Sequence, residues 1–216
     1  MENADVVEMA DYYGFSAEPR EVTTQDGYIL TNFLIHATGP ETSEPRPSIV
    51  LMHGAAGNAE SFLVNGGDHS FGFFLADNGY DVWLMNSRGN NYSRRHTTLN
   101  PDEDEEFWNF DMTSSVEDLR ATIIDALDYS GGEQVSVLGY SLGASFAMIA
   151  TSTDVEWFTP RINLLLAVNP VLILTGIQNR EIGMLTNPIL VQKGIILGAR
   201  EILAPSPFLS APPQLI

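Results

Sequence analysis

Residues 134–143 read QVSVLGYSLG, an apolar run that predicts a strand and then the pattern Gly139-x-Ser141-x-Gly143. A stretch rich in small residues, 142–151, follows directly and predicts a helix. A strand, a tight turn and a helix, with small residues beside the serine, form the context in which G-x-S-x-G makes a nucleophile elbow. The turn would project the hydroxyl out of the sheet, beside the free N–H groups of the helix. We therefore predict Ser141 as a nucleophile; the alternative is an ordinary strand–helix turn with an incidental serine.

A glycine-containing loop, His53-Gly54-Ala55-Ala56-Gly57, follows another predicted strand at residues 48–52. In hydrolases with a nucleophile elbow, this loop supplies the second N–H of the oxyanion hole, and glycine lets the backbone approach the substrate oxygen. Ala55 is the expected donor. A generic glycine-rich loop after a strand is the alternative, and the Ser141 motif makes it less favoured.

Short apolar runs alternate with helical stretches between residues 48 and 168. The predicted strands are 48–52, 80–85, 134–138 and 162–168, and the predicted helices are 71–76, 113–129 (N-capped by Thr113 or Ser114) and 142–151. This alternation is typical of a parallel sheet covered on both faces. Before it, residues 21–24 and 28–36 flank Gln25-Asp26-Gly27, a turn signal that predicts a hairpin. The predicted fold class is α/β, with an N-terminal β-hairpin and a mostly parallel, doubly wound sheet.

Composition and charge exclude several classes of partner, site and segment. The 216 residues carry a net charge of -18 at pH 7, which repels phosphate backbones, so we expect no nucleic-acid binding. The chain has no cysteine, which rules out disulfides and thiolate metal sites. The apolar stretch 162–176 contains Asn169-Pro170 and is shorter than the ~20 residues of a bilayer span, so no transmembrane segment is expected. Residues 1–5, MENAD, lack the basic and apolar pattern of a secretory signal and predict a mature or cytosolic start.

Several sequence strings together resemble the acid lipase family, which includes gastric and lysosomal acid lipases. The strings are HGA at 53–55, DVWLMNSRGN at 81–90, RRH at 94–96, FWNF at 107–110, GYSLG at 139–143, and YGF at 13–15 with EVTTQDGYIL at 21–30. The resemblance runs from about residue 9 to residue 175. The DVWL-NSRGN and RRH strings are its most specific parts.

This resemblance implies an α/β-hydrolase core that cleaves neutral lipid esters with a Ser-His-Asp triad and meets the lipid–water interface through a cap. Residues 1–176 would form the N-terminal part of that core, with the last strands missing, and residues 177–216 would begin the cap. Ser141 would be the nucleophile, and the N–H groups of Leu142 and Ala55 would be the oxyanion donors. The expected structural supports are His53, Gly54, Gly139 and Gly143. The resembled family is mostly secreted or lysosomal, and neither a cofactor nor a metal is implied.

The sequence departs from the family beside the nucleophile and after it. Tyr140 and Leu142 stand where the family usually has His and Gln, and Ala55 where it often has Leu, although backbone N–H donation survives these changes. The acid and base of such hydrolases follow the nucleophile, yet the histidines of this chain all precede Ser141: His36, His53, His69 and His96. Asp154 and Glu156 follow it, but directly after the predicted nucleophile helix.

Three hypotheses remain from the sequence. The leading one is a lipid-ester hydrolase that works through an acyl-enzyme and is inactive as this isolated chain, because the late Asp and His are absent. The second is a non-catalytic α/β-hydrolase-like module that binds lipid or protein. The third is a shortened product without a stable fold. An open reading frame that continues beyond Ile216 and encodes a late Asp and His would favour the first.

Overall fold

The computed structural model describes residues 4–39 and 45–172. The strands are β1 (Ala17–Thr23), β2 (Tyr28–Ile35), β3 (Ser48–Met52), β4 (Asp81–Met85), β5 (Arg95–His96), β6 (Val135–Tyr140) and β7 (Ile162–Val168). The α-helices are α1 (Val6–Tyr13), α2 (Phe71–Asp77), α3 (Ser115–Ser130), α4 (Leu142–Thr153) and α5 (Val155–Phe158). The 3-10 helices are η1 (Ala59–Phe62), η2 (Gly67–His69), η3 (Glu105–Trp108) and η4 (Met112–Ser114). The predicted cap residues 177–216 lie outside the described part.

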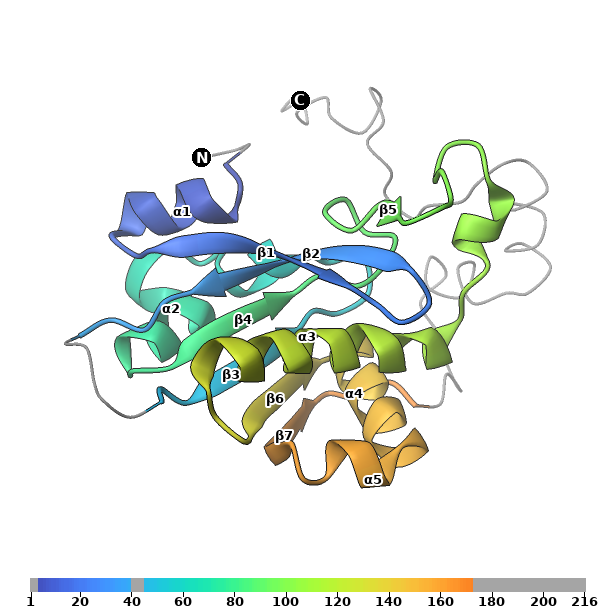
Figure 1. The fold of residues 1–216 in the computed structure, drawn as a ribbon. Helices are drawn as coiled ribbons and strands as arrows, with labels where there is room; N and C mark the ends of the chain where they lie inside the picture. The colour runs from blue at the N-terminus through green and yellow to red at the C-terminus, as the bar shows by residue number, and fades with distance from the viewer. Residues whose placement is uncertain (1–3, 40–44, 173–216) are drawn as a thin grey trace, which may run out of the picture. The chain divides into compact units, whose positions relative to one another are not determined.

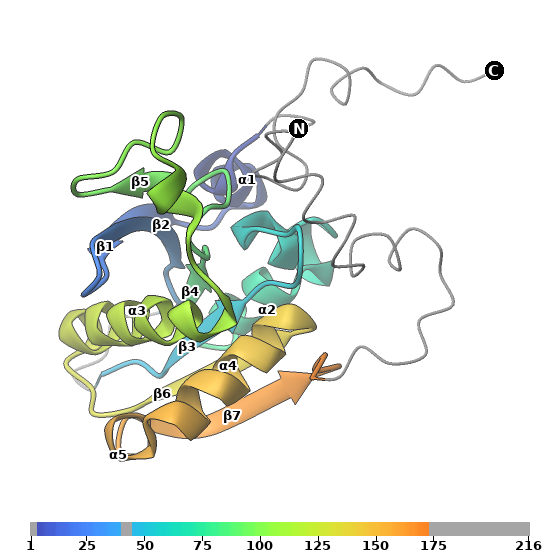
Figure 2. The ribbon, with the colours of Figure 1, turned by 90° about the vertical axis from the view of Figure 1, so that its right-hand side faces the viewer.

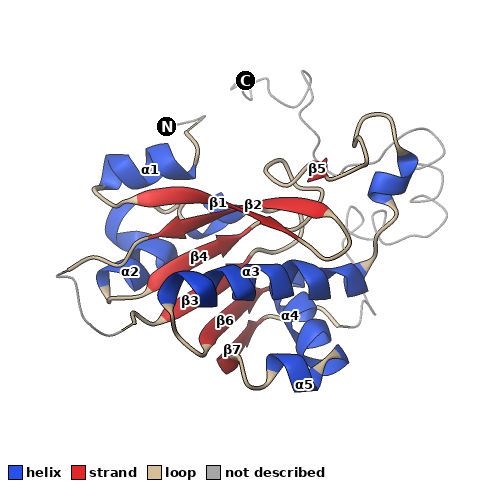
Figure 3. Ribbon diagram, viewed as in Figure 1, coloured by secondary structure: helices blue, strands red, loops and turns tan. Residues whose placement is uncertain are grey.

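The strands form one mixed sheet in the order β1-β2-β4-β3-β6-β7, with β5 paired to β2 (Figure 3). β1 and β2 make the predicted antiparallel hairpin, and β2 also runs antiparallel to β4. From β4 to β7 every pairing is parallel. The carboxyl ends of β3, β4, β6 and β7 therefore meet at one edge, where ligands bind in open α/β sheets.

Helices cover both faces of the sheet. α3 and α4 lie on one face and α2 lies on the other (Figures 1 and 2). Alternation along β3 explains this, because Ile49 and Leu51 enter the core under α1 and α2, whereas Val50 and Met52 enter the core under α3 and α4. A strand with four consecutive apolar residues, all buried, thus fits a sheet that is covered on both sides.

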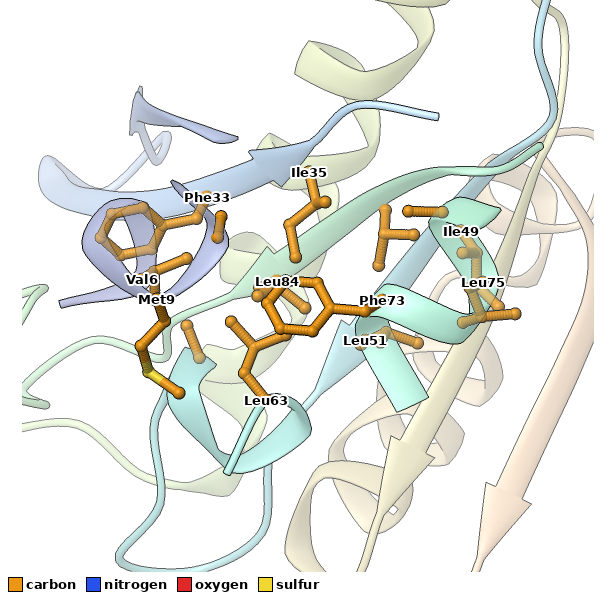
Figure 4. Packing of buried hydrophobic residues seen from close by; sticks show 14 of the residues in the cluster. Val6, Met9, Phe33, Ile35, Ile49, Leu51, Leu63, Phe73, Leu75 and Leu84 are labelled. Carbon is orange, nitrogen blue, oxygen red and sulfur yellow. The ribbon is translucent and has the colours of Figure 1, made fainter. Parts of the chain in front are cut away.

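The core on the α2 side joins segments from the start and the middle of the chain. Phe73 of α2 is fully buried in the same cluster as Leu84 of the sheet and Val6 and Met9 of α1 (Figure 4). Its ring stacks on Phe15, with the ring centres 4.4 Å apart. The first helix is therefore part of the core and holds the outer strands against α2.

Most elements lie where the sequence predicts them. The strands at 48–52 and 162–168 match β3 and β7 residue for residue, and the hairpin turn falls at Gln25-Asp26-Gly27 as predicted. β4 begins one residue later than predicted, and β6 extends to Tyr140. The predicted α/β class and mostly parallel sheet are confirmed.

Ser114, one of the two predicted caps of the helix at 113–129, occupies the N-cap position of α3, but its side chain makes no capping hydrogen bond to that helix. The Asp111 side chain accepts a hydrogen bond from the Thr113 N–H (2.8 Å) and caps the short helix η4, so α3 begins only at Ser115. Ser114 itself is in a helical conformation, and its hydroxyl accepts from the Asp111 N–H (3.4 Å) as part of the capping box of η4. A continuous chain of turns removes the free amide groups that a serine cap would have satisfied.

α1, β5, α5 and the 3-10 helices η1 to η4 are not predicted from the sequence, and the first two of these show why. α1 has a capping box, because the Asp5 side chain accepts from the Glu8 N–H and the Glu8 side chain accepts from the Asp5 N–H, and it ends at Gly14 with φ 83°. These signals were present in the sequence and are standard helix limits. β5 is two residues long, and only its pairing with Tyr28 and Ile29 of β2 makes it a strand.

β7 is the outermost strand on its side of the sheet within the described residues. Leu164, Leu166 and Val168 alternate along it and therefore share one face, and their exposed fractions are 49%, 40% and 40%. A long apolar edge of this kind is a site where other chains can pair.

Candidate active site

Ser141 lies in a strained turn between β6 and α4. Its backbone angles are φ 54° and ψ -116°, in a region that a non-glycine residue occupies at a cost of roughly 1–3 kcal/mol. The surrounding backbone holds it there: the Ser141 N–H donates to the carbonyl of Val168 (2.9 Å), and the Ser141 carbonyl accepts from the Ala144 N–H (3.1 Å). The turn predicted at Ser141 is thus present, and its strain is concentrated on the serine.

Glycine is required on both sides of this serine. A Cβ atom at Gly139 would lie 2.5 Å from the Cα and N atoms of Ala144, and one at Gly143 would lie 2.4 Å from the carbonyl oxygen of Met52. Backbone atoms cannot swing away from such contacts as a flexible side chain could. The first glycine lets α4 fold back against β6, and the second lets α4 approach the end of β3.

The loop after β3 touches the same turn. A Cβ atom at Gly54 would lie only 3.2 Å from the Ser141 Cβ, so the loop backbone passes directly beside the serine. Residues 54–57 form a β-turn closed by a hydrogen bond from the Gly57 N–H to the Gly54 carbonyl (3.2 Å). Ala56 has φ 55°, as the third residue of a type II turn requires. Ala55, the second residue of the turn, is exposed.

Two backbone N–H groups that have no partner among the described residues belong to the segments that meet at Ser141, the start of α4 and the turn after Gly54. Within residues 4–39 and 45–172, neither the Leu142 N–H nor the Ala55 N–H donates a hydrogen bond. Leu142 is the first residue of α4, where amide groups lack partners inside the helix and the helix dipole favours negative charge. The surroundings of Ser141 are therefore suited to stabilise an anion.

His53 is a buried part of the loop and is neutral. Its Nδ1 lies 2.8 Å from the Gly54 carbonyl oxygen, which can only accept, so Nδ1 carries the proton and Nε2 is the acceptor. Nε2 receives the Ser87 N–H (3.3 Å) and the Asn90 side-chain amide (3.4 Å). Burial lowers the pKa of His53, because it disfavours the charged imidazolium. Both ring nitrogens are thus engaged within the loop.

Other candidate bases and acids are engaged away from Ser141. His96 contacts the Asp26 carbonyl (2.9 Å), and His36 contacts the Tyr129 hydroxyl (3.0 Å). Asp154 binds Arg120 (2.9 Å), which lowers the pKa of the Asp154 carboxyl. In the part of the chain that the structure describes, no imidazole or carboxylate forms a hydrogen bond with the Ser141 hydroxyl.

A buried ion network holds the loop after β4 near this edge. The Arg88 side chain is 3% exposed and binds Asp118, which is 1% exposed, with 2.7 Å between the Nη2 and Oδ1 atoms. Arg88 also binds Asp26 in the β1–β2 hairpin and stacks on the Tyr28 ring at 4.1 Å. In the sequence, Arg88 stands out only as part of the family string at 81–90. Its ion pairs could not be predicted there, because Asp26 and Asp118 lie far away along the chain.

Loss of Asp118 is expected to destabilise the fold. Asp118→Ala leaves the buried Arg88 guanidinium with Asp26 alone, which should lower the free energy of unfolding by about 3 kcal/mol. Asp125→Ala is a matched control, because Asp125 binds the more exposed Arg20; its expected cost is about 1 kcal/mol or less. Urea denaturation of the two variants measures the difference, and equal losses would contradict the buried network's role.

Neither a metal site nor a membrane-spanning helix is found among the residues that the structure describes. No three His, Asp or Glu side chains among them come together in a way that could hold a metal ion. No helix in the same residues is long and apolar enough to cross a bilayer.

Comparisons with known proteins identify the family. Residues 6–66 match a partial alpha/beta-hydrolase lipase region, and residues 47–181 match the alpha/beta hydrolase fold. The chain is 40% identical over 172 residues to human lysosomal acid lipase/cholesteryl ester hydrolase, covering 78% of this chain and 43% of that protein. It is 37% identical over 180 residues to human lipase member K, covering 82% and 45%.

The chain spans about half the length of the curated relatives it matches. Mouse gastric triacylglycerol lipase is 40% identical over 156 residues, covering 70% of this chain and 39% of that protein. An α/β hydrolase from Penicillium sp. sh18 superposes with a TM-score of 0.56 at 18% identity, covering 86% of this chain and 57% of that chain. The chain belongs to the α/β-hydrolase fold family, and the relatives it resembles over most of its length are lipases.

Proposed function

We propose that Ser141 is the nucleophile of a carboxylic-ester hydrolase. The observation that carries the proposal is the strained Ser141 turn, placed between a helix N-terminus and the Gly54 loop. Strain at a single non-glycine residue is typical of positions that a function requires. The N–H groups of Leu142 and Ala55 are the proposed oxyanion donors, and His53, Gly54, Gly139 and Gly143 are the proposed supports.

The proposed reaction proceeds in two steps. The Ser141 oxygen attacks the ester carbonyl carbon while its proton passes to a base, and the carbonyl π electrons move to the oxyanion between the two N–H groups. The C–O bond to the alcohol then breaks, the alcohol takes the proton, and the acyl group stays on Ser141. Water attacks the acyl-enzyme in the same way and releases the carboxylic acid. The base and its orienting acid are proposed to follow Ile216, because the described residues bring neither to Ser141.

The proposed substrates are neutral lipid esters. The support is similarity alone, because the relatives include a cholesteryl ester hydrolase and a triacylglycerol lipase. Residues 177–216 are proposed to begin a cap that meets the lipid–water interface. A hydrolysis assay with triolein and cholesteryl oleate emulsions, beside a soluble short-chain ester, tests this: preference for the emulsions is expected, and exclusive cleavage of the soluble ester would contradict the lipid assignment.

Removing the Ala55 donor tests the proposed oxyanion hole. Proline fits the second position of the 54–57 turn, so Ala55→Pro should keep the fold while it deletes one N–H. The expected loss is about 10²–10³-fold in kcat, measured in an ester-hydrolysing form of the protein. Ala55→Gly keeps the N–H and serves as the matched control, with kcat close to the parent. Equal kcat values for Ala55→Pro and Ala55→Gly would remove Ala55 from the oxyanion hole.

A further inference from the structure

The loop that carries Ala55 is tied at both ends to one other loop. Residues 86–90, NSRGN, follow β4 and reach His53 on one side and Ala59 on the other. Asn86 is fully buried, and its Oδ1 accepts from the Ala59 N–H at 2.9 Å. Asn90 donates from Nδ2 to the same Oδ1 at 2.8 Å and to the His53 Nε2 at 3.4 Å. One side-chain amide therefore couples both flanks of the 54–58 segment.

Asn86 is itself fixed from the sheet side. Its N–H donates to the buried Asn32 side chain (2.9 Å), and its Nδ2 donates to the Thr31 carbonyl (2.7 Å) on β2. Asn90 is fixed within its own turn, because its Oδ1 accepts from the N–H groups of Tyr92 and Ser93, both at 3.0 Å. The two amides thus fix the loop relative to the sheet, and among the residues that the structure describes neither of them hydrogen-bonds to Ser141.

We infer that Asn86 and Asn90 are positioning residues that set the Ala55 N–H beside Ser141. This inference deepens the proposed function, because it explains how a short, exposed turn keeps one place. A displacement of about 1 Å in a reacting group can reduce the rate about 10²-fold, so a donor on such a turn needs a rigid support. The buried and half-buried network of hydrogen-bonded amides provides that rigidity.

Asn90→Asp separates positioning from folding. The change is isosteric and keeps the acceptor for Tyr92 and Ser93, but it replaces the donor to Asn86 and His53 with a second carboxylate oxygen. A carboxylate beside Nε2 should raise the pKa of His53 above that of the parent protein. Hydrogen exchange should become about tenfold faster at the amide groups of Gly57 and Ala59 and remain unchanged in α3.

The experiment compares full chains by hydrogen-exchange mass spectrometry and by NMR titration of the His53 ring. Asn78→Asp is the matched control, because Asn78 also donates one Nδ2 hydrogen bond (to the Phe74 carbonyl, 2.8 Å) but lies at the end of α2. Asn86→Leu is the second variant, with faster exchange expected at Ala59. If the two site variants and the control show the same exchange at residues 54–59 and the same His53 titration, the inference is overturned.

An activity measurement connects the network to the reaction. In an ester-hydrolysing form, Asn90→Asp should lower kcat by about ten- to a hundredfold with little change in KM, because the donor acts on the transition state. Faster exchange with an unchanged kcat would overturn the positioning role. Ser141→Ala is included as a separate sample. It should abolish hydrolysis and leave exchange at residues 54–59 as in the parent. Failure of the nucleophile assignment is then seen in kcat, and failure of the positioning role is seen in exchange at the loop.

Discussion

Ser141→Ala is expected to abolish ester hydrolysis in a form of the protein that carries a base and an acid after Ile216. Without the hydroxyl no acyl-enzyme forms, and only binding and the oxyanion donors remain, worth about 10³–10⁴-fold over water. The measurement is the steady-state kcat on a long-chain ester.

Ser152→Ala is the matched control for this variant. Ser152 lies on the same helix, α4, and its hydroxyl donates only to the Ile149 carbonyl (3.0 Å). Its kcat should equal that of the parent. Near-normal hydrolysis by Ser141→Ala would exclude Ser141 as the nucleophile, whatever the control shows.

The 216-residue chain alone is expected not to hydrolyse esters at an enzyme's rate. A serine hydroxyl is a weak nucleophile without an adjacent base, and His53 cannot easily serve, because its Nδ1 proton and its Nε2 lone pair are both engaged. The test is to isolate a soluble monomer by gel filtration and to assay it with a medium-chain ester and a fluorophosphonate probe. We expect background hydrolysis and no strong labelling.

Sustained turnover by this chain would defeat that expectation and would point to a histidine before Ser141. His53→Gln and His96→Gln then identify which one, since loss of the true base removes the activity and loss of the other does not. His96 hydrogen-bonds to the Asp26 carbonyl, and its Nδ1 accepts from the Thr98 N–H at 3.1 Å. His53→Gln disturbs the loop beside Ser141, whereas His96→Gln disturbs the contacts with Asp26 and Thr98. Only the variant that removes the base should lose the hydrolysis that depends on Ser141.

Self-association is the competing behaviour in this test. The exposed side chains of Leu164, Leu166 and Val168 lie together on the outermost strand of the described sheet, and unpaired apolar edges favour aggregation. The monomer peak must therefore be assayed separately from larger species, so that inactivity of the monomer is not confused with loss of soluble protein.

The sequence predicted the features that depend on local pattern. β3 and β7 are mostly apolar runs with clear limits, and a Cβ atom at either glycine beside Ser141 would meet backbone atoms at 2.4–2.5 Å. The limits of α1 are local as well, because Asp5 and Glu8 form a capping box and Gly14 ends the helix. The pattern of short-range residue types thus determined most of the sheet and the place of the candidate nucleophile.

Long-range polar contacts could not be predicted in this way. Asn86 bonds to Asn32 and Ala59, and Arg88 bonds to Asp118, partners that lie about 30 or more residues away. No periodicity links such pairs, and only the folded sheet brings them together. The start of α3 differs from the prediction for a local reason instead, because Asp111 caps the 3-10 helix η4 and η4 runs directly into α3.

Mass spectrometry of the trapped enzyme tests the central claim most directly. An ester-hydrolysing form is treated with a fluorophosphonate until activity is lost, and the modified residue is located by peptide sequencing. The structure predicts one phosphonyl adduct per chain, on Ser141, with labelling and loss of activity in parallel. Complete inactivation with the adduct on any other residue, or full activity with Ser141 modified, would contradict the assignment of Ser141 as the nucleophile.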